Sequence, residues 1–593
     1  MTFTEWFVFF LAIQVIHFLG TWKLYIKAGR KAWEAAIPIY NGIVLMQIIN
    51  RPKWWVILLF IPIINLLMFP IVWVETCRSF GFNKRPHTIL AVLTLGLFIF
   101  YVNYATDAKY IENRSLQPRS GLGEWISSIA FAIIAATLVH TYFMQPYTIP
   151  TSSLEKTLLV GDYLFVSKFH YGARVPITPI AAPMVHDTLP AIPIPFTGMN
   201  LTPQIPSYLS ESNEEKYENS WKNKLSLPYM RLPGFQKIKN NDIVVFSWPT
   251  DSLKTMWGDN SGKFTYKPVD KRTNYVKRCV AIAGDSLEIK DGFVFINGKQ
   301  LELPDRAKTQ YFYTLYSKKG ITTDKLKRYV PKEFQREYVI SFSNQEQARA
   351  VSNYGSFEQI EGSKYKITTG DKGIPSEVIK AYNINTSEVP THQRRVNLTF
   401  EEADKLRKDS AVDSLVRSID PKGIYQEDIF PHNIQYKWSQ DNFGPIYIPK
   451  KGATVKLDSK SLPFYEQIIK NYENNNLVTF NDKIYINGKE ANSYTFKQDY
   501  YWMMGDNRQN SLDARYWGYV PFDHVVGKPV LIWFSWDADA VGFMNKLKSI
   551  RWNRMFTTVG GNGKLVSYLW LAGLIIASYI GFSFYTSKKK KKS

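Results

Sequence analysis

Three short segments of this 593-residue chain hold residue types that could carry out acyl-transfer chemistry. The first, residues 149–158, places Ser153 in a proline-led loop of small residues, where a hydroxyl and a backbone N–H can both be exposed. A serine hydroxyl is a poor nucleophile until a neighbouring base accepts its proton. Taken alone, the segment fits equally well with a group of serines that caps a helix.

The second segment, residues 275–285, alternates in the manner of a half-buried strand and contains Lys277. In a strand, Lys277 shares a face with Tyr275 and Cys279, whereas Arg278 points to the opposite face. Burial disfavours the charged form of lysine, so an amine on an apolar face can be neutral at ordinary pH. The alternative is a lysine at a sheet edge whose ammonium group reaches solvent.

The third segment, residues 504–518, is dense in Gly, Asp, Asn and Arg, which indicates an ordered polar loop. Its arginines and the absence of EF-hand spacing argue against a calcium site. The chain has only two cysteines, Cys77 and Cys279, which excludes a cysteine-rich zinc site. We therefore expect no metal and no cofactor.

Together, and in this order, the segments resemble those of bacterial type I signal peptidases, a family of membrane serine proteases with a serine–lysine dyad. Residues 241–246, which read as a strand ahead of the lysine segment, resemble a further segment of that family. The serine segment is the loosest match, because Leu154 stands where the family usually has methionine and Lys156 where it usually has proline. The resemblance covers the catalytic core alone.

The resemblance implies a role for each matching residue. Ser153 is the implied nucleophile and Lys277 is its general base. The Thr151 hydroxyl and the Ser153 backbone N–H would form the oxyanion hole, and Ser511 would orient the lysine. The residues implied to brace the site are Asp506, Asn507, Arg508, Asp513 and Arg515. The implied reaction is cleavage after small residues, of the Ala-X-Ala type, through an acyl-enzyme.

Apolar runs that predict membrane spans flank this core. They cover residues 6–22, 54–74, 88–104, 125–143 and 565–585. A spanning helix needs roughly 20 mostly apolar residues, so we predict five spans. Residues 1–123 would form a membrane domain with about three spans, 124–144 a span leading to the catalytic domain, and 565–593 a C-terminal span with a cytoplasmic lysine tail.

The lysines at 588–592 place the C-terminal end in the cytoplasm by the positive-inside rule. With five spans, the N-terminus and residues 145–564 then lie on the external face, which is the periplasmic side of a bacterial inner membrane. The formal net charge of +22 suits an anionic lipid surface. The expected partners are the bilayer, preproteins that carry a signal peptide and the export translocon, with no nucleic acid.

Residues 145–564 predict a mainly β external domain. Asn297-Gly298 and Asn487-Gly488 are type I′ hairpin signals between short runs rich in β-branched and aromatic residues. Large insertions are predicted at about residues 173–240 and 304–498, the second with a helical pattern over 398–418. The predicted fold is a multi-span α-helical membrane domain joined to a mainly β, signal-peptidase-like catalytic domain.

The sequence favours a membrane-bound serine endopeptidase that removes signal peptides from exported preproteins. The alternative is a catalytically inactive membrane anchoring or assembly protein, in which the N-terminal spans and the long insertion are the functional parts. The presence of both Ser153 and Lys277 favours the enzyme. A Ser-His-Asp hydrolase is disfavoured, because no Gly-X-Ser-X-Gly pattern surrounds Ser153.

Overall fold

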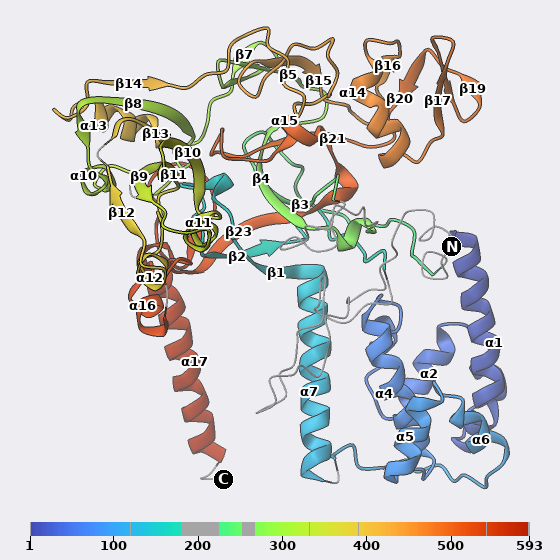
Figure 1. Ribbon diagram of the computed structural model, residues 1–593. Helices are drawn as coiled ribbons and strands as arrows, with labels where there is room; N and C mark the ends of the chain where they lie inside the picture. The colour runs from blue at the N-terminus through green and yellow to red at the C-terminus, as the bar shows by residue number, and fades with distance from the viewer. Residues whose placement is uncertain are drawn as a thin grey trace.

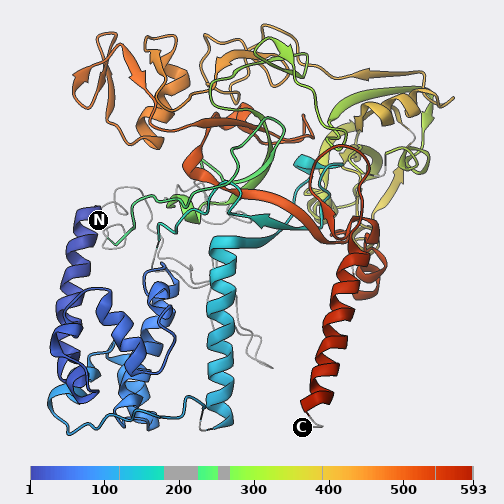
Figure 2. The same cartoon turned by 180° about the vertical axis from the view of Figure 1, so that it is seen from behind.

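The computed structural model describes residues 2–118, 120–178, 225–251, 267–330, 332–389, 391–540 and 542–590. In Figure 1 a helical unit and two separate helices, α7 and α17, lie beneath a larger, mainly β region. The N-terminus lies at the end of α1 nearest the β region, and α17 ends on the opposite side (Figures 1 and 2). Much of the insertion predicted at 173–240, and the last three residues of the lysine tail, lie outside the described residues.

Helices of different lengths within residues 3–104 pack around a shared apolar core. They are α1 (Phe3–Lys27), α2 (Tyr40–Ile48), α3 (Trp55–Leu58), α4 (Ile64–Ser79), α5 (Arg85–Leu93) and α6 (Phe98–Tyr104), with the 3₁₀ turn η1 (Ala32–Ala35). Val44, Met46 and Val102 are fully buried in this core. Large apolar side chains such as Phe7 and Trp54 are more than half exposed, as suits a surface that faces lipid.

Helices at three places are long and apolar enough to cross a membrane, among the described residues. They are Phe3–Lys27, Gly121–Phe143 and Leu569–Thr586. The second joins α7 (Gly121–Leu138) to the π-helical turn η2 (Val139–Phe143), and the third belongs to α17 (Leu569–Lys590). These helices coincide with the first, fourth and last predicted spans.

The other two predicted spans are interrupted. Residues 54–74 are divided between α3 and α4, with Ile63 at a positive φ of 68° ahead of α4. Residues 88–104 are divided between α5 and α6, which are bent by 117° at a turn where Leu95 and Gly96 have positive φ. The described residues thus hold three candidate spans, or four if the bent pair forms one span, where the sequence predicts five.

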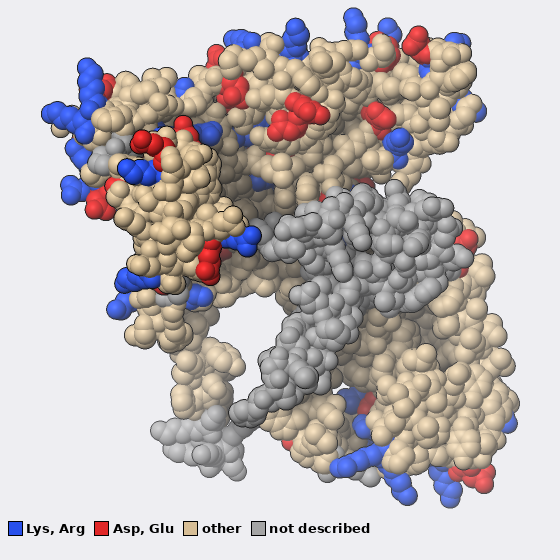
Figure 3. All heavy atoms as spheres, in the orientation of Figure 1, with Lys and Arg blue, Asp and Glu red and all other residues tan. Residues whose placement is uncertain are grey.

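Charge is distributed unevenly over the helical unit. On the face shown in Figure 3, Lys and Arg gather at its lower end, and the surface above them carries few charges. The C-terminal end of α1, at Lys27, lies on this lower side, as does the C-terminal end of α17 (Figure 1). A basic margin below an apolar belt is the pattern associated with the cytoplasmic side of a membrane.

One antiparallel sheet forms the centre of the β region, in the order β1-β2-β23-β3-β4-β21-β22, with β24 on β23. Its strands are β1 (Met144–Thr148), β2 (Asp162–Ser167), β3 (Ile243–Ser247), β4 (Asn274–Ala281), β21 (Tyr500–Met504), β22 (Val520–Pro521), β23 (Val525–Ser535) and β24 (Thr557–Thr558). Ile243 and Val245 enter one core cluster, and Val244 and Phe246 enter another. The unbroken apolar run of β3 therefore reflects burial on both faces of the sheet.

Small sheets extend from this centre. They are formed by β5 (Ser286–Lys290), β6 (Phe293–Ile296), β7 (Lys299–Gln300) and β15 (Phe443–Tyr447); by β17 (Leu477–Phe480), β18 (Lys483–Ile486) and β19 (Lys489–Glu490); and by β16 (Thr454–Lys456) with β20 (Ser493–Thr495). Both Asn-Gly pairs join adjacent hairpin strands, and Asn297, Gly298, Asn487 and Gly488 all have positive φ. The two predicted type I′ turns are present.

Residues 310–417 lie within the insertion predicted at 304–498, are called the inserted unit below, and add two sheets with short helices. One sheet contains β8 (Gln310–Ile321), β13 (Thr391–Thr399) and β14 (Ser414–Arg417), and the other β9 (Arg336–Ser341), β10 (Gly355–Glu361), β11 (Lys364–Thr369) and β12 (Asn385–Glu388). The helices are α10 (Thr323–Lys327), α11 (Gln345–Val351), α12 (Ser376–Ala381) and α13 (Phe400–Arg407). The predicted helix over 398–418 is therefore only α13, because residues on both sides of it pair with β8.

The remaining elements are short and lie between strands or before α17. They are η3 (Ser152–Leu154), η4 (Val269–Lys271), α14 (Leu462–Gln467), η5 (Ile468–Tyr472), α15 (Ala514–Trp517), η6 (Phe522–His524), α16 (Phe543–Lys548) and η7 (Trp552–Arg554). Cys77 and Cys279 are both free and buried.

Gly161, between the serine segment and β2, meets a strict backbone constraint. It has a φ of +90°, and a Cβ at this position would lie 2.1 Å from the carbonyl oxygen of Trp536. We expect Gly161→Ala to lower the apparent Tm of the detergent-solubilised protein by roughly 5 °C or more. Gly298→Ala is the matched control, since Gly298 has a φ of +80° but nothing within 4 Å of its Cβ position. Equal losses in the two variants, measured by tryptophan fluorescence, would contradict the steric argument.

Candidate active site

Ser153 lies in η3, a single 3₁₀ turn just beyond β1, and its side chain is nearly buried, at 8% exposure. Leu154 and Leu158 anchor the turn in the core beneath the sheet. The first N–H groups of any helical turn have no partner within it. Among the described residues, the Ser153 N–H makes no backbone hydrogen bond, so it is available at the surface of the turn. Thr151, just ahead of the turn, is exposed and extended.

The polar loop that follows β21 holds this turn from one side. The Asn507 backbone N–H donates to the Ser153 carbonyl at 3.1 Å, and the Asn507 side-chain amide donates to the Ser152 carbonyl at 3.1 Å. The Thr157 hydroxyl donates to Asp506 at 2.7 Å. The serine segment (residues 149–158) and the polar segment (residues 504–518), far apart in sequence, are therefore joined by hydrogen bonds.

Gly505 allows the two segments to approach closely. A Cβ at this position would lie 2.6 Å from the Ser153 carbonyl oxygen and 2.2 Å from the Ser511 hydroxyl oxygen. A side chain at 505 would thus displace either the η3 turn that holds Ser153 or Ser511. This glycine is needed for space, since its φ is not in the left-handed region.

Asp162 anchors the other end of the serine segment. This fully buried carboxylate accepts hydrogen bonds from the Leu159 N–H at 2.8 Å, the Ser535 hydroxyl at 2.6 Å and Nε of Arg554 at 3.1 Å. It therefore ties the segment to the end of β23 and to η7. The Gly161-Asp162 pair has a structural role. Gly161 allows the chain to approach the Trp536 carbonyl closely, and Asp162 accepts hydrogen bonds from Ser535 and Arg554.

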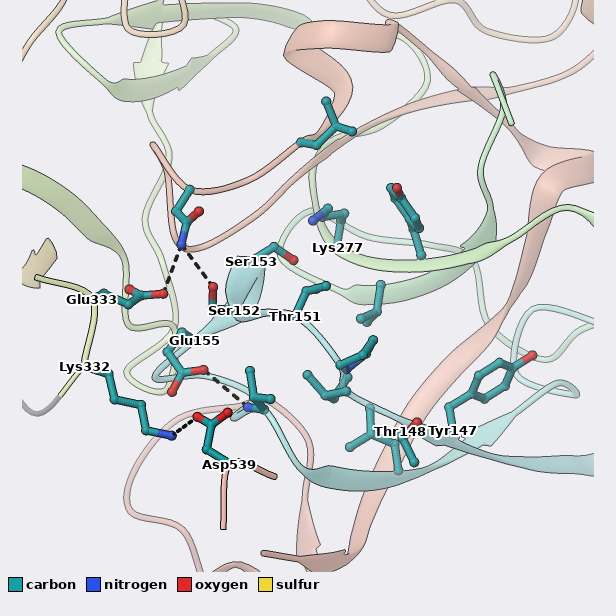
Figure 4. Close-up of a pocket in the computed structure, with 18 of the residues that line it drawn as sticks. Tyr147, Thr148, Thr151, Ser152, Ser153, Glu155, Lys277, Lys332, Glu333 and Asp539 are labelled. Atoms are coloured by element: carbon teal, nitrogen blue, oxygen red, sulfur yellow. Dashed lines mark hydrogen bonds and ion pairs between the residues drawn. The ribbon is translucent and has the colours of Figure 1, made fainter. Parts of the chain in front are cut away.

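Lys277 lies on β4, opposite Val244 of β3, and is 4% exposed. Its Nζ is 5.7 Å from the centroid of the Tyr275 ring, which places the two side chains on one side of the strand. Burial lowers the pKa of Lys277 to about 8, with a smaller opposing effect from Asp513. In Figure 4 the Lys277 amine and the Ser153 hydroxyl point toward one another. Both side chains line the same cleft.

Two buried ion pairs flank the lysine. Asp506 accepts hydrogen bonds from Nε and Nη2 of Arg278 at 2.7 and 2.6 Å. Asp513 accepts hydrogen bonds from Nε and Nη2 of Arg515 at 2.9 and 2.8 Å. Burial opposes ionisation of each carboxyl, but the adjacent arginine outweighs it and lowers the pKa of Asp506 and of Asp513. Each bidentate pair offsets a charge that would otherwise act on Lys277.

The other predicted site residues lie close by, with varied contacts. Arg508 is buried, its Nη1 is 3.6 Å from the Met504 sulfur, and its backbone N–H donates to the Gln310 carbonyl. Ser511 is 7% exposed, and its hydroxyl has no hydrogen-bond partner among the described residues. Among the described residues Ser511 thus makes no hydrogen bond to Lys277, and the orienting role of Ser511 stays a prediction.

Glu333 is a site residue that the sequence does not reveal. It lies in the inserted unit, ahead of β9, and its carboxylate accepts hydrogen bonds from the side-chain amides of Asn507, Asn510 and Asn397. Nothing in its local sequence marks it, because its partners are as many as 177 residues away in the chain. Burial raises the pKa of Glu333, and hydrogen bonds from Ser152, Asn507 and Asn510 oppose that effect.

The cleft has a volume of about 550 Å³, and its two ends differ in chemistry. The apolar half is lined by Tyr147, Ile149, Leu164, Val245 and Val276. The charged half is lined by Glu155, Lys332, Glu333, Asp371, Lys372 and Asp539. Figure 4 shows Ser153 and Lys277 between Tyr147 and Thr148 on one side and Lys332, Glu333 and Asp539 on the other.

Backbone edges with free hydrogen-bonding groups border the apolar half. Among the described residues, β1 is an edge strand of the sheet and pairs with β2 alone. In the same part of the chain, residues 274–277 of β4 pair with β3 and not with β21, whose pairing covers Arg278 to Ala281. An extended polypeptide laid between these edges could hydrogen-bond to them as an added strand.

Comparison with known proteins gives the family. The family described as "Signal peptidase, peptidase S26" matches residues 122–344 and 447–536, just over half of the chain. Residues 33–113 match a family of unknown function (DUF5684). The first match leaves out residues 345–446, which lie within the insertion predicted at 304–498; the ends of that insertion stay a prediction.

Several curated relatives carry the name "Signal peptidase I". The protein of Helicobacter pylori is 36% identical over 89 residues, which are 14% of this chain and 31% of the relative. The protein of Buchnera aphidicola from Acyrthosiphon pisum is 22% identical over 465 residues, 76% of this chain and 91% of the relative. That of Rickettsia felis is 25% identical over 208 residues, 35% of this chain and 53% of the relative.

The chain belongs to the signal peptidase family, peptidase S26. The resemblance seen in the sequence is thereby confirmed, and with it the class of serine peptidase.

The buried pair of Asp506 with Arg278 can be tested by stability. We expect Asp506→Asn to cost about 3–5 kcal/mol of unfolding free energy, because it leaves a buried arginine without its counter-charge. Glu401→Gln is the control, since the Glu401–Lys308 pair has side chains 69% and 40% exposed and should contribute less than about 1 kcal/mol. Chemical unfolding in detergent measures the unfolding free energy of both variants. Similar losses in the two would contradict a special contribution of the buried Asp506–Arg278 pair to stability.

Proposed function

We propose that this chain removes signal peptides from exported preproteins with a dyad of Ser153 and Lys277. The observation that carries the proposal is the shared cleft, in which a nearly buried serine faces a lysine with a pKa lowered to about 8. A neutral amine beside a hydroxyl meets the requirement of a Ser–Lys variant of the serine-protease triad.

In the proposed reaction, the Lys277 amine accepts the Ser153 proton as the serine oxygen attacks the scissile carbonyl. The Ser153 N–H and the Thr151 hydroxyl stabilise the resulting oxyanion, the first from the open end of η3. The Lys277 ammonium then gives its proton to the departing amine, leaving an acyl-enzyme. Water attacks that ester with Lys277 again accepting a proton, and the free serine is restored.

We assign the residues before the cut to the apolar half of the cleft. Leu164, Val245 and Val276 offer a shallow apolar surface close to Ser153, which suits small side chains of the Ala-X-Ala type. The free edges of β1 and of residues 274–277 would hold the peptide extended. The bracing roles go to Asp506, Asn507, Arg508, Asp513 and Arg515, which hold the serine turn and Lys277 in place.

The proposed setting is a bacterial inner membrane, with several spans and the catalytic domain on the periplasmic face. The common position of the basic end of α1 and the lower end of α17 supports a cytoplasmic side there. The cleft would then lie outside the bilayer, where it can meet a signal peptide that is still held in the membrane. The export translocon is the further proposed partner.

The first test is cleavage of a purified preprotein with an Ala-X-Ala site by the detergent-solubilised chain. We expect Ser153→Ala and Lys277→Met each to lower the rate by at least about 10³-fold, because the nucleophile and its base act as one unit. Ser286→Ala and Lys290→Met, at exposed positions on β5, are the matched controls and should keep the parent rate. A folded parent that leaves the preprotein intact would favour the alternative of an inactive membrane anchoring or assembly protein.

The pH dependence tests the lysine. Only the neutral amine accepts a proton, so we expect kcat/KM to rise about tenfold per pH unit below the pKa of about 8 and to level off above it. Lys277→Arg should be inactive at every pH, because arginine stays protonated. Stability should rise with pH between about 8 and 10.5, where the unfolded chain binds the proton that the folded chain has lost. A kcat/KM that falls through this range would contradict the assignment.

A further inference from the structure

Glu333 connects the inserted unit to the nucleophile turn through a hydrogen-bond network. Its Oε1 receives the Asn510 amide at 3.0 Å, and the same amide donates to the Ser152 hydroxyl at 3.0 Å. Its two oxygens also receive the Asn507 amide at 3.1 and 3.0 Å, and that amide donates in turn to the Ser152 carbonyl. Each path from Glu333 thus reaches the residue next to Ser153 through one asparagine.

The inserted unit holds Glu333 from behind. Asn397 on β13 donates to Oε2 of Glu333 at 2.9 Å and to the side-chain oxygen of Asn507 at 2.6 Å. The Asn397 backbone N–H donates to the Glu333 carbonyl at 3.1 Å. Glu333 has a positive φ of 64°, a conformation that such contacts must stabilise in a non-glycine residue.

The neighbouring residue fixes the same segment to the main sheet. Lys332 forms ion pairs with Asp537 at 3.0 Å and Asp539 at 3.1 Å, just beyond β23. Lys156, three residues after the nucleophile, pairs with Glu402 on α13 at 2.9 Å. The inserted unit is therefore joined to the catalytic domain on both sides of Ser153.

We propose that Glu333 is a positioning residue for the reaction, holding the Ser152–Ser153 turn through Asn507 and Asn510. A carboxylate suits this position because it only accepts hydrogen bonds, and the side-chain amides of Asn397, Asn507 and Asn510 all donate to it. The proposal rests on the proposed function and extends the active site into the inserted unit. Glu333 acts through the turn, not through Lys277, so it should influence the rate of chemistry and not the titration of the base.

The test compares kcat, KM and the pH profile of parent and variant on the same Ala-X-Ala peptide. Glu333→Gln replaces one acceptor with an NH₂ group that faces donors, so we expect kcat per folded enzyme to fall about 10–100-fold, as for a misplaced reacting group. KM should stay within about threefold and the midpoint of the pH profile should stay near 8. Glu358→Gln, exposed on β10 of the same unit, is the matched control.

A donor–acceptor exchange provides the rescue. In the double variant Glu333→Gln with Asn510→Asp, the new amide at 333 can donate to the new carboxylate at 510, which is an exposed position. Recovery of kcat by at least about fivefold over Glu333→Gln would support positioning. A single variant that keeps the parent kcat, or one whose loss follows a lowered Tm and is not rescued, would overturn it. Failure of the parent to cleave any preprotein would instead refute the proposed function.

Discussion

The proposed active site depends on keeping one buried lysine, Lys277, neutral among buried charges. A lysine pKa of about 8 instead of 10.5 corresponds to about 3 kcal/mol of differential stabilisation of the neutral form. Burial supplies this effect, and two nearby aspartates would cancel it if their charges were free. Asp506 and Asp513 are instead bound bidentately by Arg278 and Arg515. The charges next to Lys277 are thus balanced in pairs, and desolvation controls the pKa.

The same ion pairs connect the chemistry to the fold. Arg278 follows Lys277 in β4, so the strand that presents the base to the cleft also presents the counter-charge of Asp506 to the other side. Asp506 in turn accepts the Thr157 hydroxyl, and Asn507 next to it donates to the Ser153 carbonyl. The separation of Ser153 and Lys277 is therefore set by contacts of residues that lie close to one or the other in the sequence. A dyad needs such short connections, because an error of about 1 Å in its geometry can cost roughly 100-fold in rate.

How far the sequence reaches depends on the range of the contacts involved. Local chemistry was readable: the Asn-Gly turns form hairpins, the apolar run of β3 is a buried strand, and the serine, lysine and polar segments meet at one cleft. The breaks at Ile63 and Leu95 were not, because hydropathy reports the environment of a segment and not the continuity of its helix. The helical pattern over 398–418 produces a helix only in α13, because the residues on both sides pair with β8, and this tertiary interaction overrides the local preference.

Glu333 lies at the far end of that scale, since its proposed role depends on partners in two separate segments, β13 and the polar loop after β21. Lys332 and Lys372 line the cleft from the inserted unit, and both form ion pairs with Asp539 of the catalytic domain. The charged half of the cleft is therefore shared between the two, whereas the apolar half comes from β1, β2, β3 and β4 and the loop after β1. Ser153 and Lys277 thus lie between an apolar half and a charged half of one cleft, and the inserted unit contributes only to the charged half.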